Sequence, residues 1–140
     1  MSQFSDYTEQ NILTTTLRGG AFPVPSGVYI ALFTTDPTDA ASGAEVNDAS
    51  WTTYVRVDAA DGGNIDTGWT APADGVSSNA KVITFPANNA GSSVTITHIG
   101  VFDAATAGNL LYHAPLVSSK TLLDGDVLSF AIGAITVTVA

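Results

Sequence analysis

The last third of the chain reads as a series of short β-strands joined by tight turns. An Asp-Gly pair, Asp124 and Gly125, separates two apolar-rich runs, and the second run alternates apolar and small polar residues from position 127 to 132. Such a pair supplies the positive φ angles that a tight hairpin needs. Gly133 then interrupts the apolar pattern, which favours a bend followed by a final strand over 135–139. The sequence therefore predicts a hairpin across Asp124 and Gly125.

Strand-like patterns also recur upstream, at intervals of roughly ten residues. They cover residues 28–34, 51–58, 81–85, 94–102 and 110–115. In the first of them apolar side chains occupy both alternating sets, so we expect both faces to be covered. In the second, Trp51, Tyr54 or Val55, and Val57 are available to a core. The fold class is therefore all-β: an antiparallel β-sandwich or flattened barrel of about six to eight strands.

Two segments depart from the strand pattern. The amino end predicts one short helix, with Asp6 and Glu9 as a capping box and Gly19 with Gly20 as the stop. Residues 40–50 are loop-like, and residues 59–80 form the longest irregular region, where contacts with another molecule are expected. We expect one domain over 1–140, with a helix and extended arm over 1–25 and the β-sandwich over 26–140.

Charge limits the classes of partner. Thirteen acidic residues against four basic ones give a net charge of -9, which repels phosphate backbones and anionic lipid surfaces. We therefore expect no nucleic-acid and no membrane partner. Only 12% of residues are charged, and the Ser- and Thr-rich remainder suits packing against neighbouring proteins. Solitary β-sandwiches are also rich in Ser and Thr, so this alternative stays open.

Other sequence features concern the compartment. The chain has no cysteine, which excludes disulfides and thiolate metal sites. The sequence after Met1 lacks the basic, apolar pattern of a leader, and no apolar run is long enough to span a bilayer. We therefore expect a protein that is made and assembled in the cytoplasm of a host cell.

Several motifs resemble one family. They are VYIALFTTDPTDA (28–40), YVRV (54–57), KVITFP (81–86), THIGVFDAATAGNLL (97–111) and SKTLLDGDVLSFAIGAITVTV (119–139). In this order they resemble a family of small tailed-bacteriophage virion proteins, over about residues 6–139. Members of that family are often labelled tail fibre proteins, and others look like capsid decoration proteins. The resemblance implies a virion structural protein.

No catalytic pattern stands out beside this resemblance. His98 and His113 lie inside strand signals and are expected to be half-buried and hydrogen-bonded, because the sequence places no carboxylates beside them. Ser118 and Ser119 lack the spacing of a serine nucleophile, and the Gly-Gly pairs lack the Lys of a phosphate loop. We therefore expect neither an enzyme nor a bound cofactor or metal.

Three further groups have a functional and a structural interpretation. The residues Asp58, Asp61, Asn64 and Asp66 fit calcium ligands or ordinary turn residues, and turn residues are favoured. The aromatic residues Trp51, Tyr54 and Trp69 fit either a sugar-stacking platform or plugs under long loops, and plugs are favoured. Arg56 is expected to pair with Asp36 or Asp103 and to organise a loop.

The function expected from these observations is capsid decoration: an oligomeric cement protein on the capsid exterior, bound to the major capsid protein and to copies of itself. The alternative is a tail fibre or a tail adaptor or receptor-binding module, with tail proteins or a host surface glycan as partners. The expected interface residues are Phe4, Tyr7, Phe22 and Trp69. The first three lie in an N-terminal segment that we expect to act as a docking arm.

Overall fold

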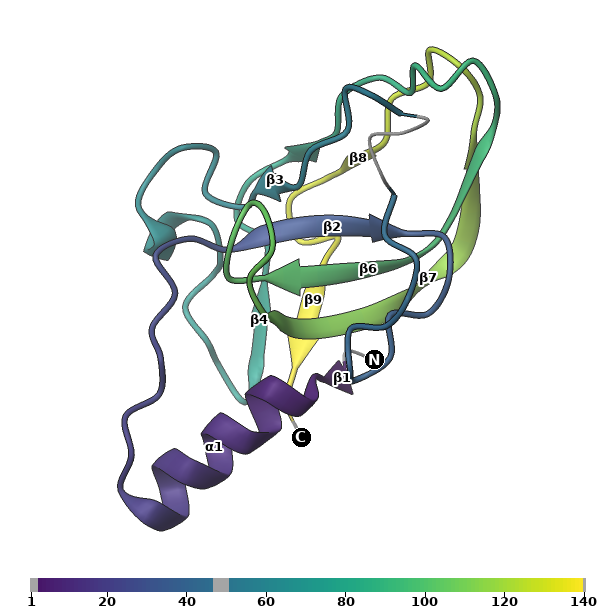
Figure 1. The fold of residues 1–140 in the computed structure, drawn as a ribbon. Helices are drawn as coiled ribbons and strands as arrows, with labels where there is room; N and C mark the ends of the chain where they lie inside the picture. Colours follow the sequence, from purple (N-terminus) through teal and green to yellow (C-terminus); the bar gives the residue numbers. More distant parts are fainter. Residues whose placement is uncertain (1–2, 47–50, 140) are drawn as a thin grey trace.

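The computed structural model describes residues 3–46 and 51–139, and residues 47–50 of the predicted loop 40–50 lie outside it. The strands are β1 (Gln3–Phe4), β2 (Tyr29–Phe33), β3 (Val57–Asp58), β4 (Val76–Ser78), β5 (Ile83–Thr84), β6 (Val94–Phe102), β7 (Leu110–Leu122), β8 (Ser129–Phe130) and β9 (Thr136–Thr138). One α-helix, α1 (Asp6–Arg18), and one 3₁₀ turn (Ile65–Thr67) complete the set (Figure 1). The fold is all-β and sandwich-like, without a closed barrel, as the sequence predicts.

The strands form one large sheet and two small ones, all antiparallel. The five-stranded sheet has the order β1-β7-β6-β2-β3, while β4 pairs with β9 and β5 pairs with β8. Nine strands thus occur in the described part of the chain, against the six to eight expected. The difference comes from strands of two residues, such as β1 and β3, which are too short to show any alternation.

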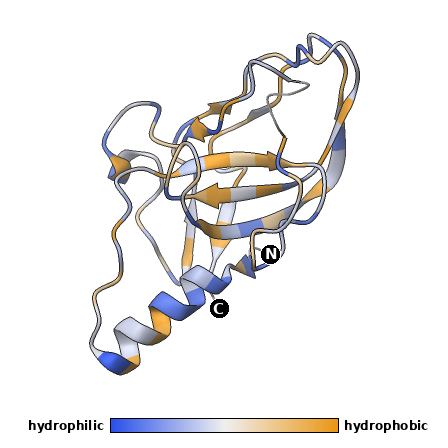
Figure 2. Ribbon diagram, viewed as in Figure 1, coloured by the Kyte–Doolittle hydropathy of each residue, from blue (hydrophilic) through white to orange (hydrophobic). Residues whose placement is uncertain are grey.

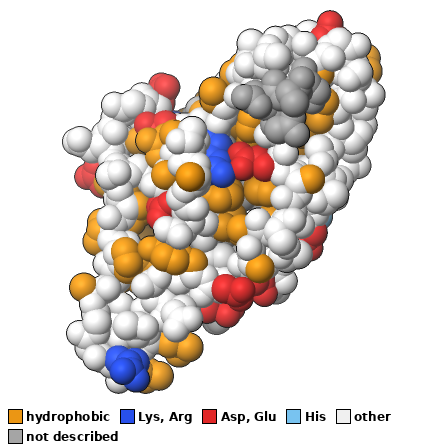
Figure 3. All heavy atoms as spheres, viewed as in Figure 1, with side chains coloured by type: hydrophobic (Ala, Val, Ile, Leu, Met, Phe, Trp, Pro, Cys, Tyr) orange, Lys and Arg blue, Asp and Glu red, His pale blue; other side chains and the backbone are white. Residues whose placement is uncertain are grey.

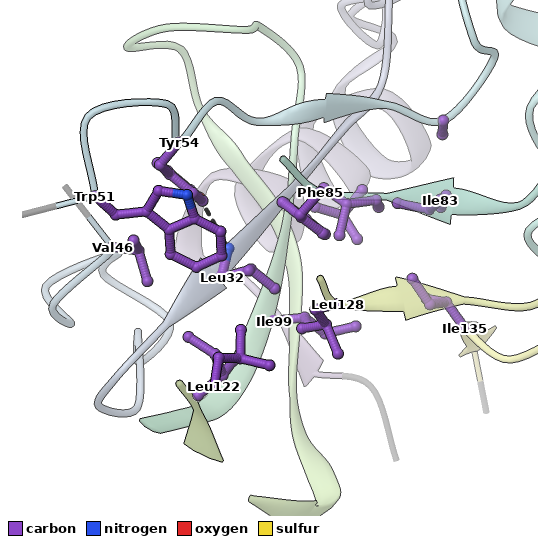
Figure 4. Close-up of a cluster of buried hydrophobic side chains, with 14 residues drawn as sticks. Leu32, Val46, Trp51, Tyr54, Ile83, Phe85, Ile99, Leu122, Leu128 and Ile135 are labelled. Atoms are coloured by element: carbon purple, nitrogen blue, oxygen red, sulfur yellow. Dashed lines mark hydrogen bonds between the residues drawn. The ribbon is translucent and has the colours of Figure 1, made fainter. Parts of the chain in front are cut away.

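The main core lies between the five-stranded sheet and the two small sheets. Ile30 and Leu32 of β2 meet Ile83 and Phe85 from the β5 side and Leu128 from the β8 side (Figure 4). Each of these side chains is at most 8% exposed. Strands β2 and β6 are largely hydrophobic along their length, whereas α1 is mixed (Figure 2). Burial of this apolar surface supplies the main driving force for the fold.

A second cluster covers the outer face of β2. Ala31 and Phe33 pack there with Phe102 and Leu110, and the rings of Phe33 and Phe102 stack with centroids 6.2 Å apart. Gly100 lies under these rings, because a Cβ at this position would be 2.8 Å from the ring of Phe33. The prediction that both faces of β2 are covered is therefore confirmed.

The helix begins one residue earlier than the capping-box prediction places it. Ser5, not Asp6, is the N-cap, and its hydroxyl accepts a hydrogen bond from the Thr8 amide at 3.2 Å. The same hydroxyl donates to the Leu110 carbonyl, so β7 holds Ser5 at the cap position. At the other end Gly19 adopts the left-handed conformation, with φ 69°, as predicted.

Strand β7 is longer than its sequence signal, because it continues through Pro115 to Leu122. Proline lacks a backbone donor and is tolerated at a sheet edge, and β1 covers β7 only at Tyr112 and His113 among the described residues. The register of β6 against β7 shifts between Ile96 and His98, where β7 contributes extra residues. At this bulge Val117 is fully exposed.

The turn at Asp124 and Gly125 forms, but the predicted hairpin does not. Gly125 has φ 89°, and the Asp126 amide donates to the Leu123 carbonyl at 3.0 Å. The flanking strands nevertheless go to different sheets, because β7 pairs with β6 whereas β8 pairs with β5. The buried residue Asn88 explains this, since its backbone bonds both Gly125 and Asp126 and holds the turn against another loop. The bend at Gly133 and the final strand β9 are as predicted.

Candidate docking groove and its surroundings

An apolar groove of about 280 Å³ lies where the β4–β9 sheet meets the five-stranded sheet. Its walls include Thr8 of α1, Phe22 of the arm, Trp69 and Tyr112 of β7. None of the lining residues is charged. The structure therefore brings together two of the expected interface residues, Phe22 and Trp69, although 47 positions separate them in the chain (69 − 22).

The other two expected interface residues lie beside this groove without lining it. Phe4 packs on Tyr112, with ring centroids 5.5 Å apart and planes tilted by 41°. Tyr7 is half-buried in the first turns of α1, and its carbonyl accepts a hydrogen bond from the Asn11 side chain at 2.8 Å. Phe4 thus contacts the groove residue Tyr112, whereas Tyr7 precedes the groove residue Thr8 in α1.

Tyr112 is one of the groove residues that the sequence patterns did not identify as interface residues. It lies in β7 opposite Phe4 of β1, within the run of apolar residues that opens the strand. Burial raises the pKa of its phenol above the ordinary value, which indicates a poorly hydrated position. No local signal distinguishes a tyrosine at the end of a groove from one in an ordinary sheet.

Trp69 is half-buried and packs against the main core. Its backbone forms an isolated bridge with Asn79, and its indole N–H is buried without a partner in residues 3–46 and 51–139. Trp51 and Tyr54 lie in the core, where Trp51 is fully buried and donates its indole N–H to the Thr53 hydroxyl at 3.1 Å. The three aromatic residues therefore do not form a shared platform, and the plug interpretation describes Trp51 and Tyr54.

Arg56 forms a half-buried ion pair at the side of the sandwich, with Glu45 as its partner. Its Nε and Nη2 donate to the two carboxylate oxygens of Glu45 at 2.8 and 2.7 Å. Pairing with Asp36 or Asp103 was the wrong expectation, because Glu45 follows the loop that returns beside β2 and forms a bridge to Phe33. Arg56 Nη1 also donates to the carbonyls of Ala104 and Ala107, so it does organise the loop between β6 and β7.

The guanidinium of Arg56 also covers the outer aromatic cluster. Its central carbon lies 3.5 Å from the centroid of the Phe102 ring, a cation–π contact. The Tyr54 hydroxyl donates to Glu45 at 3.0 Å and accepts from the Leu32 amide at 2.9 Å. Burial and the nearby Glu45 carboxylate raise the pKa of Tyr54 far above its ordinary value. This network is structural, since each polar group in it already has a partner.

Of the residues considered as calcium ligands, Asp58 and Asn64 lie at turns. Asp58 accepts hydrogen bonds from the Ala60 and Gly62 amides at 2.9 and 3.0 Å, which closes the turn after β3. Asn64 precedes the 3₁₀ turn without a side-chain cap. In the described ranges, no three His, Cys, Asp or Glu side chains are arranged to hold a metal ion.

The two histidines lie closer to carboxylates than the sequence indicates. His113 is buried and bonds Asp39 through Nε2 at 2.9 Å, while His98 Nε2 lies 3.9 Å from Asp36. The loop that follows β2 brings these aspartates against the outer face of β6 and β7. Sequence reasoning missed this cluster because its members are far apart along the chain.

The surface view shows where hydrophobic and charged side chains lie on one face. Hydrophobic side chains gather above α1 and across the middle of the body, where a basic and an acidic group lie side by side, and further acidic groups lie toward the edges (Figure 3). Exposed apolar residues also follow the outer half of α1 and the arm: Leu13 is 57%, Leu17 is 77% and Val24 is 85% exposed. Among the described residues, no helix has the length and apolar character needed to cross a bilayer.

Comparison with known families gives one match that covers nearly the whole chain. The family described as "Podophage GP4 fiber I protein gp80" matches residues 3–138. A comparison with curated proteins found no match. The matched range includes all the strands, α1 and each residue of the groove. The chain therefore belongs to the Podophage GP4 fiber I protein gp80 family and is a structural protein of a tailed-phage virion.

Proposed function

We propose that the chain is a subunit of a podophage tail fibre and that the apolar groove is where a neighbouring virion protein binds. The observation that carries the proposal is the match to a fibre family over residues 3–138. The β-rich, cysteine-free domain is consistent with a role in assembly. The expected partners are copies of the same chain and other tail proteins.

The chemistry of the groove favours a protein segment as the bound partner. Its walls are uncharged and mostly apolar, so an apolar side chain would lose little hydration there. A glycan would need hydrogen bonds for its many hydroxyls. The partnerless indole N–H belongs to a groove residue, Trp69, so a backbone carbonyl that reached it would satisfy a buried donor.

Particle composition tests the fibre assignment against capsid decoration. We expect quantitative gel densitometry of purified virions to give tens of copies or fewer, with antibody labelling at the tail. Hundreds of copies, with label distributed over the head, would replace the fibre by a cement protein bound to the major capsid protein. Absence from purified particles would contradict both locations.

A pair of substitutions in the arm tests the groove. Phe22→Asp places a carboxylate in the groove wall, whereas Val24→Asp places one on an 85% exposed side chain two residues away. We expect F22D to be lost from particles and V24D to be incorporated at the wild-type level, with equal circular dichroism spectra. Equal incorporation of both variants would exclude the groove as the docking site. The fibre assignment would then be tested by the copy number alone.

A further inference from the structure

Two histidines of β6 and β7 form a cluster with two aspartates on the outer face of the five-stranded sheet. His113 is 2% exposed, and its Nε2 lies 2.9 Å from Asp39 Oδ1. Its other ring nitrogen, Nδ1, faces Asp36 Oδ1 at 3.6 Å. His98 approaches the second oxygen of Asp36, with 3.9 Å between Nε2 and Oδ2. His113 thus lies between two carboxylates.

The contact with Asp39 assigns the tautomer of the neutral His113 ring. A carboxylate only accepts hydrogen bonds, so the 2.9 Å contact requires the proton of neutral His113 on Nε2. The lone pair of Nδ1 then faces a second carboxylate and makes no hydrogen bond, consistent with the lack of a partner for Nδ1 within the described residues. One more proton on His113 would turn this repulsive contact into a charge-assisted hydrogen bond.

The loop that supplies the two aspartates is compact and strained. Thr38 and Ala41 have φ angles of 57° and 55°, in the left-handed region that residues with a Cβ rarely adopt. Gly43 packs so closely that a Cβ there would lie 2.3 Å from the Asp36 carbonyl oxygen. Such a loop keeps its conformation only when contacts outside it hold it in place.

The same loop is joined to the start of α1. The Asp6 amide donates to the Asp39 carbonyl at 3.0 Å, next to the N-cap Ser5. The side chain of Asp39 bonds His113, and its backbone carbonyl accepts from the first residue of α1. A change in the contact between His113 and Asp39 therefore affects the first turn of α1.

We propose that His113, with His98, is a pH-sensitive latch that tightens the Asp36–Asp39 loop and the start of α1 on acidification. Protonation adds a donor at His113 Nδ1 aimed at Asp36 and places positive charge between two carboxylates. At alkaline pH the cluster keeps only the bond to Asp39, and the strained loop is held less firmly. The proposal is independent of where in the particle the protein resides.

The surroundings of the cluster support the direction of this response. The loop after β2 contributes Asp36 and Asp39, β6 contributes His98, and α1 begins with a further carboxylate, Asp6. The residue of β1 opposite His113 is the neutral Gln3. Apart from His98, the charged groups around His113 are carboxylates, so a positively charged ring there would lie beside negative partners.

Amide hydrogen exchange tests the latch in the full chain. Protection factors would be compared at about pH 5.5 and about pH 8, in buffer with a chelator, so that only protons vary. For the Asp6 and Thr38 amides we expect about tenfold more protection at the lower pH, the effect of one charge-assisted hydrogen bond. The Asn88 amide donates to the Asp126 carbonyl in another loop, and its ratio of protection factors at the two pH values serves as the reference.

Two variants remove the response by different routes. His113→Gln keeps an amide donor for Asp39 and cannot take up a proton in this range. Asp36→Asn keeps the side-chain oxygen that accepts from the Thr38 amide at 2.9 Å but loses the charge. We expect both variants to show the same protection at the two pH values.

Asp58→Asn is the matched control, because Asp58 closes a similar turn by accepting from the Ala60 and Gly62 amides at 2.9 and 3.0 Å. D58N is expected to keep the wild-type response. A wild-type protein without the tenfold ratio, or a D36N variant that retains it, would overturn the proposal. If H113Q fails to fold, D36N still decides, since the Asp36 side chain is 55% exposed.

Discussion

Asn79 holds Ile135 at both of its backbone polar groups. The Asn79 amide donates to the Ile135 carbonyl at 3.0 Å, and the Ile135 amide donates to the Asn79 side-chain oxygen at 2.8 Å. The side-chain nitrogen of Asn79 donates to the carbonyls of Lys81 and Ala131 at 2.7 and 2.9 Å. This fully buried amide therefore fixes the turn that leads into β9.

Replacement of Asn79 by alanine is expected to destabilise the protein by about 2–4 kcal/mol, because it leaves the buried Ile135 amide and the Lys81 carbonyl without this partner and removes one of the two donors to the Ala131 carbonyl. Urea denaturation measures the loss. Asn64→Ala is the control, since Asn64 makes no side-chain capping bond, and it should change stability by less than about 0.5 kcal/mol. Equal effects of the two substitutions would contradict the role given to Asn79.

Arg56→Lys tests whether the geometry of the guanidinium matters in addition to its charge. A lysine cannot bond both oxygens of Glu45 and reach the carbonyls of Ala104 and Ala107 at once. We expect a loss of about 2–4 kcal/mol by denaturant unfolding. The same change at the exposed Arg18 should cost less than about 0.5 kcal/mol. If R56K matches wild type, charge alone accounts for the contact.

Alkaline pH should weaken the fold through Tyr54 and Tyr112. Burial is the first cause that raises the pKa of each phenol in the folded state. In the unfolded chain a tyrosine ionises at its ordinary value of 10.0, so stability is fully present below that pH and is lost as the pH rises above it. The urea midpoint, measured across this range, should fall more steeply for wild type than for a Tyr54→Phe, Tyr112→Phe double variant. Parallel profiles would show that other groups control alkaline unfolding.

Gly43→Ala should disrupt the loop after β2. The added Cβ would lie 2.3 Å from the Asp36 carbonyl oxygen and 2.4 Å from Pro37 Cα, and backbone atoms cannot move aside without displacing the loop. We expect a loss of more than about 2 kcal/mol. Gly91→Ala isolates the dihedral cost, because Gly91 has a positive φ with open space around it, and it should cost about 1 kcal/mol. Thermal denaturation compares the stability of the two variants. A smaller loss of stability for Gly43→Ala than for Gly91→Ala would contradict the close packing at Gly43.

The sequence predicted the strands and the helix that are long enough to show a periodic pattern of apolar residues. Strand β6 spans the predicted 94–102, and β2 falls within 28–34 with both faces buried. Helix α1 ends at the predicted Gly19. Its N-cap was misplaced because Ser5 and Asp6 are both good capping residues, and the choice depends on β7, whose Leu110 carbonyl accepts from Ser5.

Local sequence patterns did not predict the features that depend on contacts between residues far apart in the chain. The hairpin at Asp124 and Gly125 was predicted from its turn residues, yet the loop around Asn88 determines where β8 goes. The partner of Arg56 and the carboxylates beside His113 come from the loop after β2, and no spacing rule relates these positions. Of the groove, Phe22 and Trp69 were expected as interface residues, whereas Tyr112 appears only once β1 and β7 are paired.

The attachment of α1 has a mechanical consequence. Thr8 is its one buried residue, and the hydroxyls of Ser5 and Thr8 bind adjacent carbonyls of β7, at Leu110 and Leu111. With a rise of about 1.5 Å per residue, Leu17 lies roughly 13 Å further along the axis. The helix is therefore a lever clamped at one end (Figure 1). A small shift of the first turn, which Ser5 and Thr8 attach to β7, is therefore amplified at the far end of the helix, where Leu17 is exposed.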